Sequence, residues 1–180
     1  MAKSETIINT ERLQLREIVD SDLENIFNGL SNEDVTKYYA VSFSSLEETK
    51  TQMEWYKNLR HEKTGIWWAI CSKDHQIFYG AIGYNDLDQE HQKAEIGFWL
   101  LPQFWRQGFI KEALSPVIDY GFTILNLHRI EAFVESGNEA SSRMLKSKSF
   151  NYEGTLRECE LKSNHFISLD VFAKINQSTS

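Results

Sequence analysis

The sequence is poor in the residues that build metal centres and disulfide frameworks. Its 180 residues include only two cysteines, Cys71 and Cys159, and five histidines. Neither cysteine belongs to a CxxC motif or stands at a zinc-ligand spacing from a histidine. We therefore expect no metal site, and we interpret both cysteines as buried or free thiols rather than as a pair.

Long apolar runs and a basic net charge are also missing. No apolar run approaches the roughly 20 residues that span a membrane, and the polar start MAKSETIINTER lacks the core of a signal peptide. The formal net charge is −7, which argues against a nucleic-acid surface. These absences predict a cytoplasmic protein that binds neither membranes nor nucleic acid.

The chain does contain enough apolar residues for one sizeable core. Hydrophobic residues make up 41% of its 180 residues, and no repeat, low-complexity tract or linker interrupts residues 1–180, so we expect a single domain. Apparent capping boxes at Ser21 with Glu24 and at Ser45 with Glu48 predict two helix starts. Further helices are expected at residues 33–38, from about residue 107, and at 138–148. The apolar periodicity predicts seven strands, at residues 11–18, 66–71, 76–84, 93–101, 127–134, 152–160 and 165–174.

The most informative stretch runs from Ala94 to Leu125. It reads as an apolar strand, a turn that starts with a proline and contains one glycine, and a segment of helical period. The first turn of a helix leaves about four N–H groups without intrahelical partners, at the positive end of the macrodipole, and a diphosphate suits such an end. If this helix begins near residue 107 or 108, the donors come from Gln107, Gly108, Phe109 and Ile110.

Gly108 is central to this interpretation. Because it has no Cβ, phosphate oxygens can approach its backbone and the residue can adopt a positive φ. On spacing alone, a packed connection without any ligand is the simpler interpretation. The absence of GK[ST] after Gly108 argues against a nucleotide-binding P-loop.

Taken together, these segments resemble a known family. The stretch EIGFWLLPQFWRQGFIKEAL resembles the acyl-CoA-binding strand and pyrophosphate loop of the GNAT superfamily of N-acetyltransferases, and it is most similar to the RimJ/RimL-like branch that acetylates ribosomal-protein N-termini. Other similar segments lie in order along nearly the whole chain: TERLQLR, WWAI, AIG, LHRIEAFV, NEASSRML and FNYEGTLRE. The resemblance implies an α/β (mixed α+β) GNAT fold, with a strongly twisted, mostly antiparallel sheet of about seven strands, helices on both faces and a splayed central strand.

The resemblance also implies acetyl-CoA as cosubstrate and names the residues that would bind it. The pantetheine arm would pair with the freed backbone of Phe98, Trp99 and Leu100 and with the side chain of Asn138. The diphosphate would lie on the loop made of Arg106, Gln107, Gly108, Phe109 and Ile110. Related sequences usually have glycine at Arg106, so this residue either gains a phosphate contact or forces a different loop conformation.

A basic stretch in an acidic chain fits this cosubstrate. Residues 141–150 carry Arg143, Lys146 and Lys148 with no acid, so the remainder of the chain sums to −7 − 3 = −10. Such a distribution suits an anionic cosubstrate at a basic helix, including a contact from Arg143, and a cationic amine on an acidic body. A solvated helix face explains the basic residues equally well.

Acetyl transfer to an amine also needs a base for the ammonium and a proton for the departing thiolate. By resemblance, Ser141 matches the hydroxyl that meets the sulfur, and Glu160 matches the general base, with Glu95 as the rival base and Tyr152 as a weaker acid. Asn138 and Ser141 also fit a helix N-cap with its first turn, and Glu160 fits a solvated strand end. A covalent route through a cysteine is less favoured, because no motif lowers the pKa of either thiol.

We therefore expect acetyl-CoA-dependent N-acetylation of a primary amine. A protein N-terminal α-amine ranks ahead of a polyamine, amino acid or aminoglycoside, and the alternative from another class is a non-catalytic acyl-CoA-binding module. The protein is expected to be a monomer or a homodimer. Aromatic residues before the second predicted strand either line the acceptor site or belong to the core: Tyr38, Tyr39, Phe43, Trp55 and Tyr56.

Overall fold

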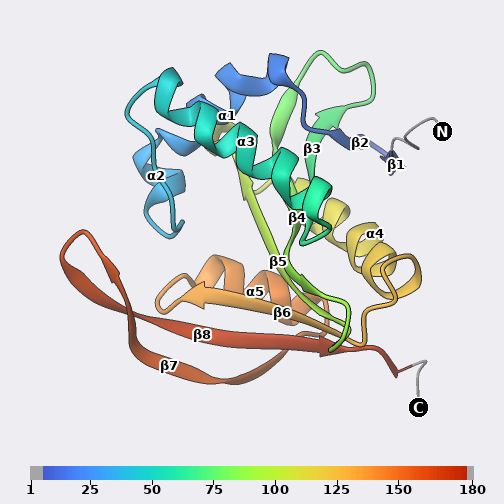
Figure 1. Ribbon diagram of the computed structural model, residues 1–180, viewed down its shortest axis with the longest axis vertical. Coiled ribbons are helices and arrows are strands. Elements are labelled where there is room, and N and C mark those ends of the chain that lie inside the picture. Colours follow the sequence, from blue (N-terminus) through green and yellow to red (C-terminus); the bar gives the residue numbers. More distant parts are fainter. Residues whose placement is uncertain (1–5, 178–180) are drawn as a thin grey trace.

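The computed structural model describes residues 6–177 and shows one mixed sheet with helices on both faces (Figure 1). The strand order is β1-β2-β3-β4-β5-β6-β8-β7. The described sheet has eight strands because the two-residue β1 adds to the seven that were expected. The strands are β1 (Ile8–Asn9), β2 (Leu13–Glu17), β3 (Ile66–Ser72), β4 (Phe78–Asp88), β5 (Lys93–Leu100), β6 (Arg129–Glu135), β7 (Asn151–Lys162) and β8 (His165–Ile175).

The helices begin largely where the sequence predicts. The side chain of Ser45 accepts the N–H of Glu48 at the start of α3, and that of Asn138 accepts the N–H of Ser141 at the start of α5. Gly108 is the N-cap of α4, with φ 82°. The helices are α1 (Leu23–Leu30), α2 (Glu33–Thr36), α3 (Leu46–Glu62), α4 (Phe109–Thr123) and α5 (Glu139–Ser147), with 3₁₀ turns η1 (Asp20–Asp22) and η2 (Pro102–Phe104).

The capping box predicted at Ser21 is wrong. A 3₁₀ turn precedes α1, and the carboxylate of Asp22 accepts the N–H of Val19 at 2.9 Å. Asp22 is buried and forms a bidentate ion pair with Arg16 of β2, at 2.7 and 2.8 Å. This pair, which no local pattern reveals, fixes the entry to α1 in place of the serine hydroxyl.

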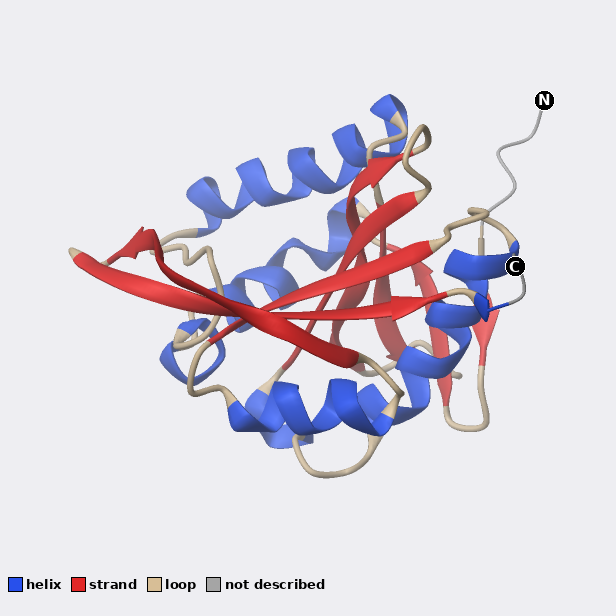
Figure 2. Cartoon of the chain, turned by 90° about the horizontal axis from the view of Figure 1, so that it is seen from below, coloured by secondary structure: helices blue, strands red, loops and turns tan. Residues whose placement is uncertain are grey.

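The central strand β5 separates from β6, as the resemblance implies. β5 pairs with β4 as far as Leu100, but its parallel ladder with β6 has three pairs, from Lys93–Arg129 to Glu95–Glu131. Every other pairing in the described sheet is antiparallel. Beyond Glu95 the sheet therefore opens into a V, with β1–β5 on one arm and β6–β8 on the other (Figures 1 and 2).

Two cores lie on opposite faces of β5. Ile96 and Leu100 pack with α4 on one face, and Trp99 packs with α1 and α3 on the other. Gly29 of α1 lies so close to the Trp99 ring that a Cβ there would come within 2.1 Å of it. Among residues 6–177, no helix is long and apolar enough to cross a membrane, and no group of side chains could hold a metal ion.

Candidate active site

The side of β5 that faces the V carries open backbone groups. The N–H of Leu101 bonds to the Tyr79 carbonyl at 2.9 Å, and successive residues of a strand bond to alternate sides. The N–H and carbonyl of Trp99 therefore face β4. The N–H and carbonyl groups of Phe98 and Leu100 face the gap between β5 and β6. The Leu100 carbonyl accepts the indole N–H of Trp105 at 2.9 Å. In the described part of the chain, the N–H and carbonyl of Phe98 have no partner, so they can pair with an extended amide ligand.

In the loop between β5 and α4, the N–H groups of Phe104 and Trp105 are bonded within the loop, whereas those next to α4 are open. The carbonyls of Gln103 and Gln107 accept bonds from Gln107 Nε2 and Arg12 Nη1, at 2.8 and 3.1 Å. The first α4 donor to find a carbonyl is the N–H of Glu112, bonded to Gly108 at 3.0 Å. No acceptor among residues 6–177 binds the N–H groups of residues 107–111, which makes the start of α4 a candidate anion site.

Arg106 adopts a backbone conformation that favours glycine. Its φ is 61°, and Gly108, two residues later, has a φ of 82°. Non-glycine residues rarely take such values. The arginine therefore keeps a glycine-like turn, and its exposed side chain is free to reach solvent or a ligand.

Arg12, at the turn before β2, clamps this loop to the first turn of α4. The side-chain Nε of Arg12 lies 2.7 Å from Glu112 Oε2, and the backbone N–H of Arg12 donates to Glu112 Oε1 at 2.8 Å. The guanidinium also lies over the Phe109 ring, 4.6 Å from the centroid, in addition to its bond with the Gln107 carbonyl. Thr10 donates to the same carboxylate at 2.5 Å. Sequence reasoning missed this clamp, although the segment TERLQLR contains Thr10 and Arg12.

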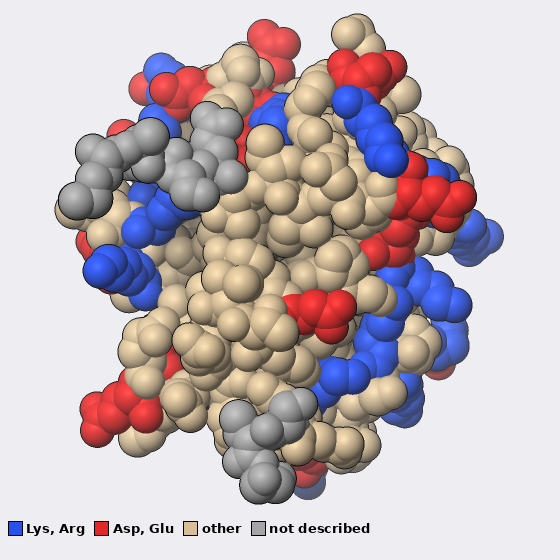
Figure 3. Space-filling model, turned by 90° about the vertical axis from the view of Figure 1, so that its right-hand side faces the viewer, with Lys and Arg blue, Asp and Glu red and all other residues tan. Residues whose placement is uncertain are grey.

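Basic side chains gather along α4. Lys148 donates to Ser115 Oγ at 2.5 Å, and Lys174 donates to the Lys148 carbonyl at 2.6 Å. Burial and the charges of Lys111 and Lys174 lower the pKa of Lys148. Figure 3 shows a run of Lys and Arg at the lower right of this face, with further basic side chains at its left edge and top. An anionic group would relieve the repulsion among these lysines.

An acidic cavity lies at the base of the V, where β4, β5 and β6 meet. Its volume is about 340 Å³, and its lining consists of Asp86, Asp88, Lys93, Glu95, Glu131 and Phe133. Glu131 is paired with Arg129 at 2.7 Å and lies 3.7 Å from Lys93. Four acids against one lysine in the lining make the cavity attractive to a cation.

Glu95 is the most strongly perturbed carboxyl of this cavity. Burial, followed by the charge of Asp86, raises its pKa to about 7, and the charges of Glu160 and Glu131 add to the effect. One bond opposes the shift, since Asn85 Nδ2 donates to Glu95 Oε2 at 3.1 Å. Near neutral pH this carboxyl is therefore poised between its two protonation states.

The lining of this cavity includes none of the five aromatic residues that were considered for the acceptor site. Burial, with smaller effects from Tyr56 and Glu95, raises the pKa of Tyr39 well above its usual range, so its hydroxyl stays protonated close to Glu95. Tyr56, in contrast, is buried and packs on Trp55 and Trp67 at 5.3 and 5.6 Å between ring centroids. Of the remaining candidates, Tyr38 lies under the ammonium group of Lys37. Phe43 packs on the core that α1 and α3 form with the sheet.

The start of α5 holds the other predicted site residues. Asn138 caps the helix through its Oδ1, which leaves its Nδ2 free to donate, and Ser141 lies half-buried in the first turn. Arg143 is exposed and pairs with Glu139 at 2.8 Å on the helix surface. The structure thus places Asn138 and Ser141 together at the open end of β6, and Arg143 on the outside.

The structure separates the remaining candidates by environment. Glu160 is exposed on β7, although its charge reaches Glu95. The Tyr152 hydroxyl bonds with Thr155 at 2.6 Å, and its ring packs edge-on against Phe172. Cys159 is exposed, whereas burial raises the pKa of Cys71 to about 11. The acidic residues Asp86 and Glu131, and Phe133 beside them, were missed because their grouping arises only when β4, β5 and β6 meet.

Comparisons with known proteins agree with this geometry. The model of the acetyltransferase (GNAT) domain matches residues 12–150. An uncharacterized N-acetyltransferase of Bacillus subtilis, YoaA, is 43% identical over 153 residues, covering 84% of this chain and 86% of that protein. The ribosomal-protein-serine acetyltransferase of Escherichia coli is 22% identical and covers 97% of this chain and 99% of its own.

Solved structures show the same fold. The crystal structure of a GNAT-family acetyltransferase from Bacillus anthracis superposes with a TM-score of 0.82 at 25% identity, covering 94% of this chain and 98% of that one. The spermidine N-acetyltransferase of Vibrio cholerae, in complex with CoA and spermine, superposes with a TM-score of 0.80 at 23% identity. The superposition covers 91% of this chain and 95% of that one.

Proposed function

The chain belongs to the acetyltransferase (GNAT) family of N-acetyltransferases, and on this basis we propose that it transfers acetyl from acetyl-CoA directly to an amine bound in the acidic cavity. One observation carries the proposal: β5 holds open backbone groups at Phe98 and, three residues earlier, the perturbed carboxyl of Glu95. A cosubstrate on the edge of the strand and an amine on its face would then meet.

The chain offers three sets of groups to the cosubstrate. The N–H groups of residues 107–111 and the cations of Arg106 and Lys111 suit the phosphates. The open backbone of Phe98 and the free amide of Asn138 suit the two amide groups of the pantetheine arm. When bound, acetyl-CoA supplies the acetyl group and a thiolate leaving group.

Glu95 is the base that the geometry favours. An α-ammonium has a pKa of about 8, so a carboxylate with a pKa near 7 can accept its proton without a large energetic penalty. The freed nitrogen then attacks the thioester carbon, and the C–S bond breaks. Glu160 is exposed and acts in this scheme through its charge, which holds the pKa of Glu95 high.

Ser141 is assigned to the departing thiolate. Its hydroxyl lies in the first turn of α5, beside Asn138 and next to the open end of the V. A thiol has a pKa of about 8.5, so a hydroxyl at hydrogen-bond distance is sufficient to guide its proton. Direct transfer is favoured over a cysteine intermediate, because Cys71 is buried with a raised pKa and Cys159 lies on the exposed strand β7.

The acceptor is proposed to be a protein N-terminal α-amine, as in the RimJ/RimL-like branch. Its low pKa among biological amines suits a base as weak as Glu95. A polyamine is the second candidate, since four acids around one cavity would hold a multiply charged cation. Relatives of this chain include both a ribosomal-protein acetyltransferase and a spermidine acetyltransferase.

Thiol release from acetyl-CoA tests the proposal. We expect release that depends on an added amine and is fastest with peptides that carry a free N-terminus, when these are compared with spermidine, free amino acids and an aminoglycoside. Peptides with a blocked N-terminus serve as the matched control. Tight acetyl-CoA binding in calorimetry, without thiol release for any amine, would instead identify a non-catalytic binding module.

A further inference from the structure

The cavity continues into an apolar surface on the β6–β8–β7 arm. Residues that pair across a ladder point to the same face, and Phe133 of the cavity lining pairs with Val171. In the next row, Leu169 pairs on one side with Glu135 and on the other with Leu156. Glu131, which also lines the cavity, lies on this same face. We call Phe133, Val171, Leu169 and Leu156 the apolar strip.

The apolar strip is accessible to solvent. Phe133 is 36% exposed and Leu156 is 47% exposed, while Val171 and Leu169 are half-buried beside them. The opposite face of β6 is fully used, because Ile130, Ala132 and Val134 are buried in the core with α5. A sheet face that is covered on one side and exposes four apolar side chains on the other marks a binding surface.

Charges orient a ligand on this surface. Glu95 and Asp86 lie at the cavity end of the strip, whereas Lys162 occupies the far end, where it donates to Glu135 Oε2 at 2.7 Å. The unbalanced acids at the cavity end therefore favour the cationic head of a ligand at Glu95, with its apolar body on the strip. A polyamine, which carries charge along its whole length, would gain little from the apolar strip.

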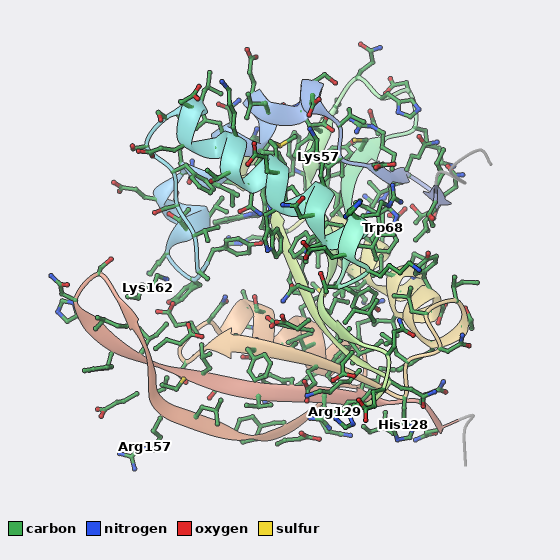
Figure 4. The ribbon with its side chains drawn as sticks, in the orientation of Figure 1. Lys57, Trp68, His128, Arg129, Arg157 and Lys162 are labelled. Atoms are coloured by element: carbon green, nitrogen blue, oxygen red, sulfur yellow. The ribbon has the colours of Figure 1, made fainter. Side chains whose placement is uncertain are left out.

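The far end of the strip is held in place by the rest of the molecule. Lys162, at the tip of the β7–β8 hairpin, also donates to the carbonyl of Lys37 just after α2, at 2.5 Å. Figure 4 shows Lys162 below α2, with the hairpin spanning the open side of the V. The hairpin is thus tied to the other arm by this bond, beside the far end of the strip.

We propose that the apolar strip binds the residues that follow the acceptor amine, so the acceptor is an extended peptide with apolar side chains near its N-terminus. This inference rests on the proposed function and names its substrate class. Successive rows of the strip are two residues apart along β8, roughly 6.7 Å. Alternate side chains of an extended peptide have the same spacing, so apolar residues at the second and fourth positions would contact the two rows.

A paired set of peptides and leucine variants tests the inference. The peptides share one N-terminal serine and carry leucine or serine at the second and fourth positions. The variants are Leu156→Ala in the strip and Leu161→Ala on the same strand, where Leu161 is 64% exposed and pairs with Phe166 on the opposite face. With the wild type, we expect kcat/KM to be roughly 10- to 50-fold higher for the leucine peptide.

The two variants should then diverge. Leu156→Ala is expected to lower kcat/KM for the leucine peptide roughly 5- to 20-fold and leave the serine peptide and the KM for acetyl-CoA unchanged. Leu161→Ala should behave as wild type with both peptides. Equal rates for both peptides, a preference for spermidine, or equal effects of the two variants would overturn the inference while leaving the transferase intact. Failure of the wild type to acetylate any amine would overturn the proposed function itself.

Discussion

At the scale of single residues, two carboxyls of the same chemistry differ through their surroundings. Glu95 is half-buried among acids, and its pKa rises to about 7. Glu160 is exposed, and it influences the site through its charge on Glu95. A family motif alone favours Glu160 as base, whereas burial and charge favour Glu95.

Replacing each carboxyl by its amide should therefore give different pH profiles. In the wild type we expect kcat/KM to rise with pH through about 7 as Glu95 ionises. Glu95→Gln should remove this limb and lower kcat by roughly 10²- to 10⁴-fold. Glu160→Gln should stay active and shift the limb to lower pH, because it removes a negative charge that raises the pKa of Glu95. A silent Glu95→Gln with a crippled Glu160→Gln would reverse the assignment.

The stability of Glu95→Gln provides a control for folding. In the native state the Glu95 carboxyl holds its proton up to a pH of about 7, whereas an unfolded glutamate loses it near 4.3. The native state thus binds more protons in this window, and wild-type stability falls as the pH rises through it. Glu95→Gln removes that loss. In thermal unfolding, the variant and the wild type should therefore have the same free energy of unfolding at pH 4, and the variant should be more stable by on the order of 1–3 kcal/mol at pH 8.

At the scale of elements, the start of α4 depends on a residue far from it in sequence. Arg12 binds the carboxylate of Glu112 and the carbonyl of Gln107, and it covers the Phe109 ring. Although burial alone would raise it, the bonds from Thr10 and Arg12 keep the pKa of Glu112 lowered, so the pair stays ionised at neutral pH. The clamp thus engages the Gln107 carbonyl and leaves the neighbouring N–H groups to an anionic ligand.

Breaking this clamp should weaken cosubstrate binding selectively. Arg12→Met removes two charge-assisted bonds and is expected to raise the KM for acetyl-CoA roughly tenfold, with little change in the KM for the peptide. Arg157→Met is the matched control, because Arg157 is exposed and points away from the molecule (Figure 4). Steady-state kinetics with each substrate varied in turn measure the split, and equal increases in both KM values would contradict the clamp's role.

The elements also show what the sequence could predict. Local chemistry was sufficient for the helix starts at Ser45, Gly108 and Asn138, since each depends on neighbours within a few residues. The Ser21 capping box failed because Asp22, held by Arg16 at the end of β2, accepts the N–H of Val19 in its place. The strand β4 was also expected to end at Tyr84. It continues to Asp88, because Asn85 and Asp88 pair with Glu95 and Lys93 in the first residues of β5.

The site was less predictable than the fold for the same reason. Periodicity placed Glu95 and Trp99 on one face of β5 correctly. The splay of β5 from β6 followed from family resemblance and not from any local pattern. The acidic lining and the apolar strip combine β4, β5, β6, β7 and β8, so their grouping depends on the register of strands that are distant in sequence.

At the scale of the whole molecule, the two arms of the V carry different parts of the proposed site. The arm of β1–β5 carries Glu95 and the open backbone of Phe98, and the arm of β6–β8 carries Ser141 at one end and the apolar strip on its face. Acids line the cavity between the arms, whereas lysines gather beside α4 (Figure 3). An anionic cosubstrate and a cationic acceptor would thus approach from different sides and meet at β5.

A single-turnover experiment tests direct transfer most sharply. Protein in excess over acetyl-CoA is mixed with a leucine-containing peptide, and mass spectrometry follows both the protein and the peptide over time. We predict that acetyl appears on the peptide α-amine at the rate of thiol release, while the mass of the protein stays constant. An acetylated protein that forms first and then decays as the peptide gains the group would contradict direct transfer at Glu95.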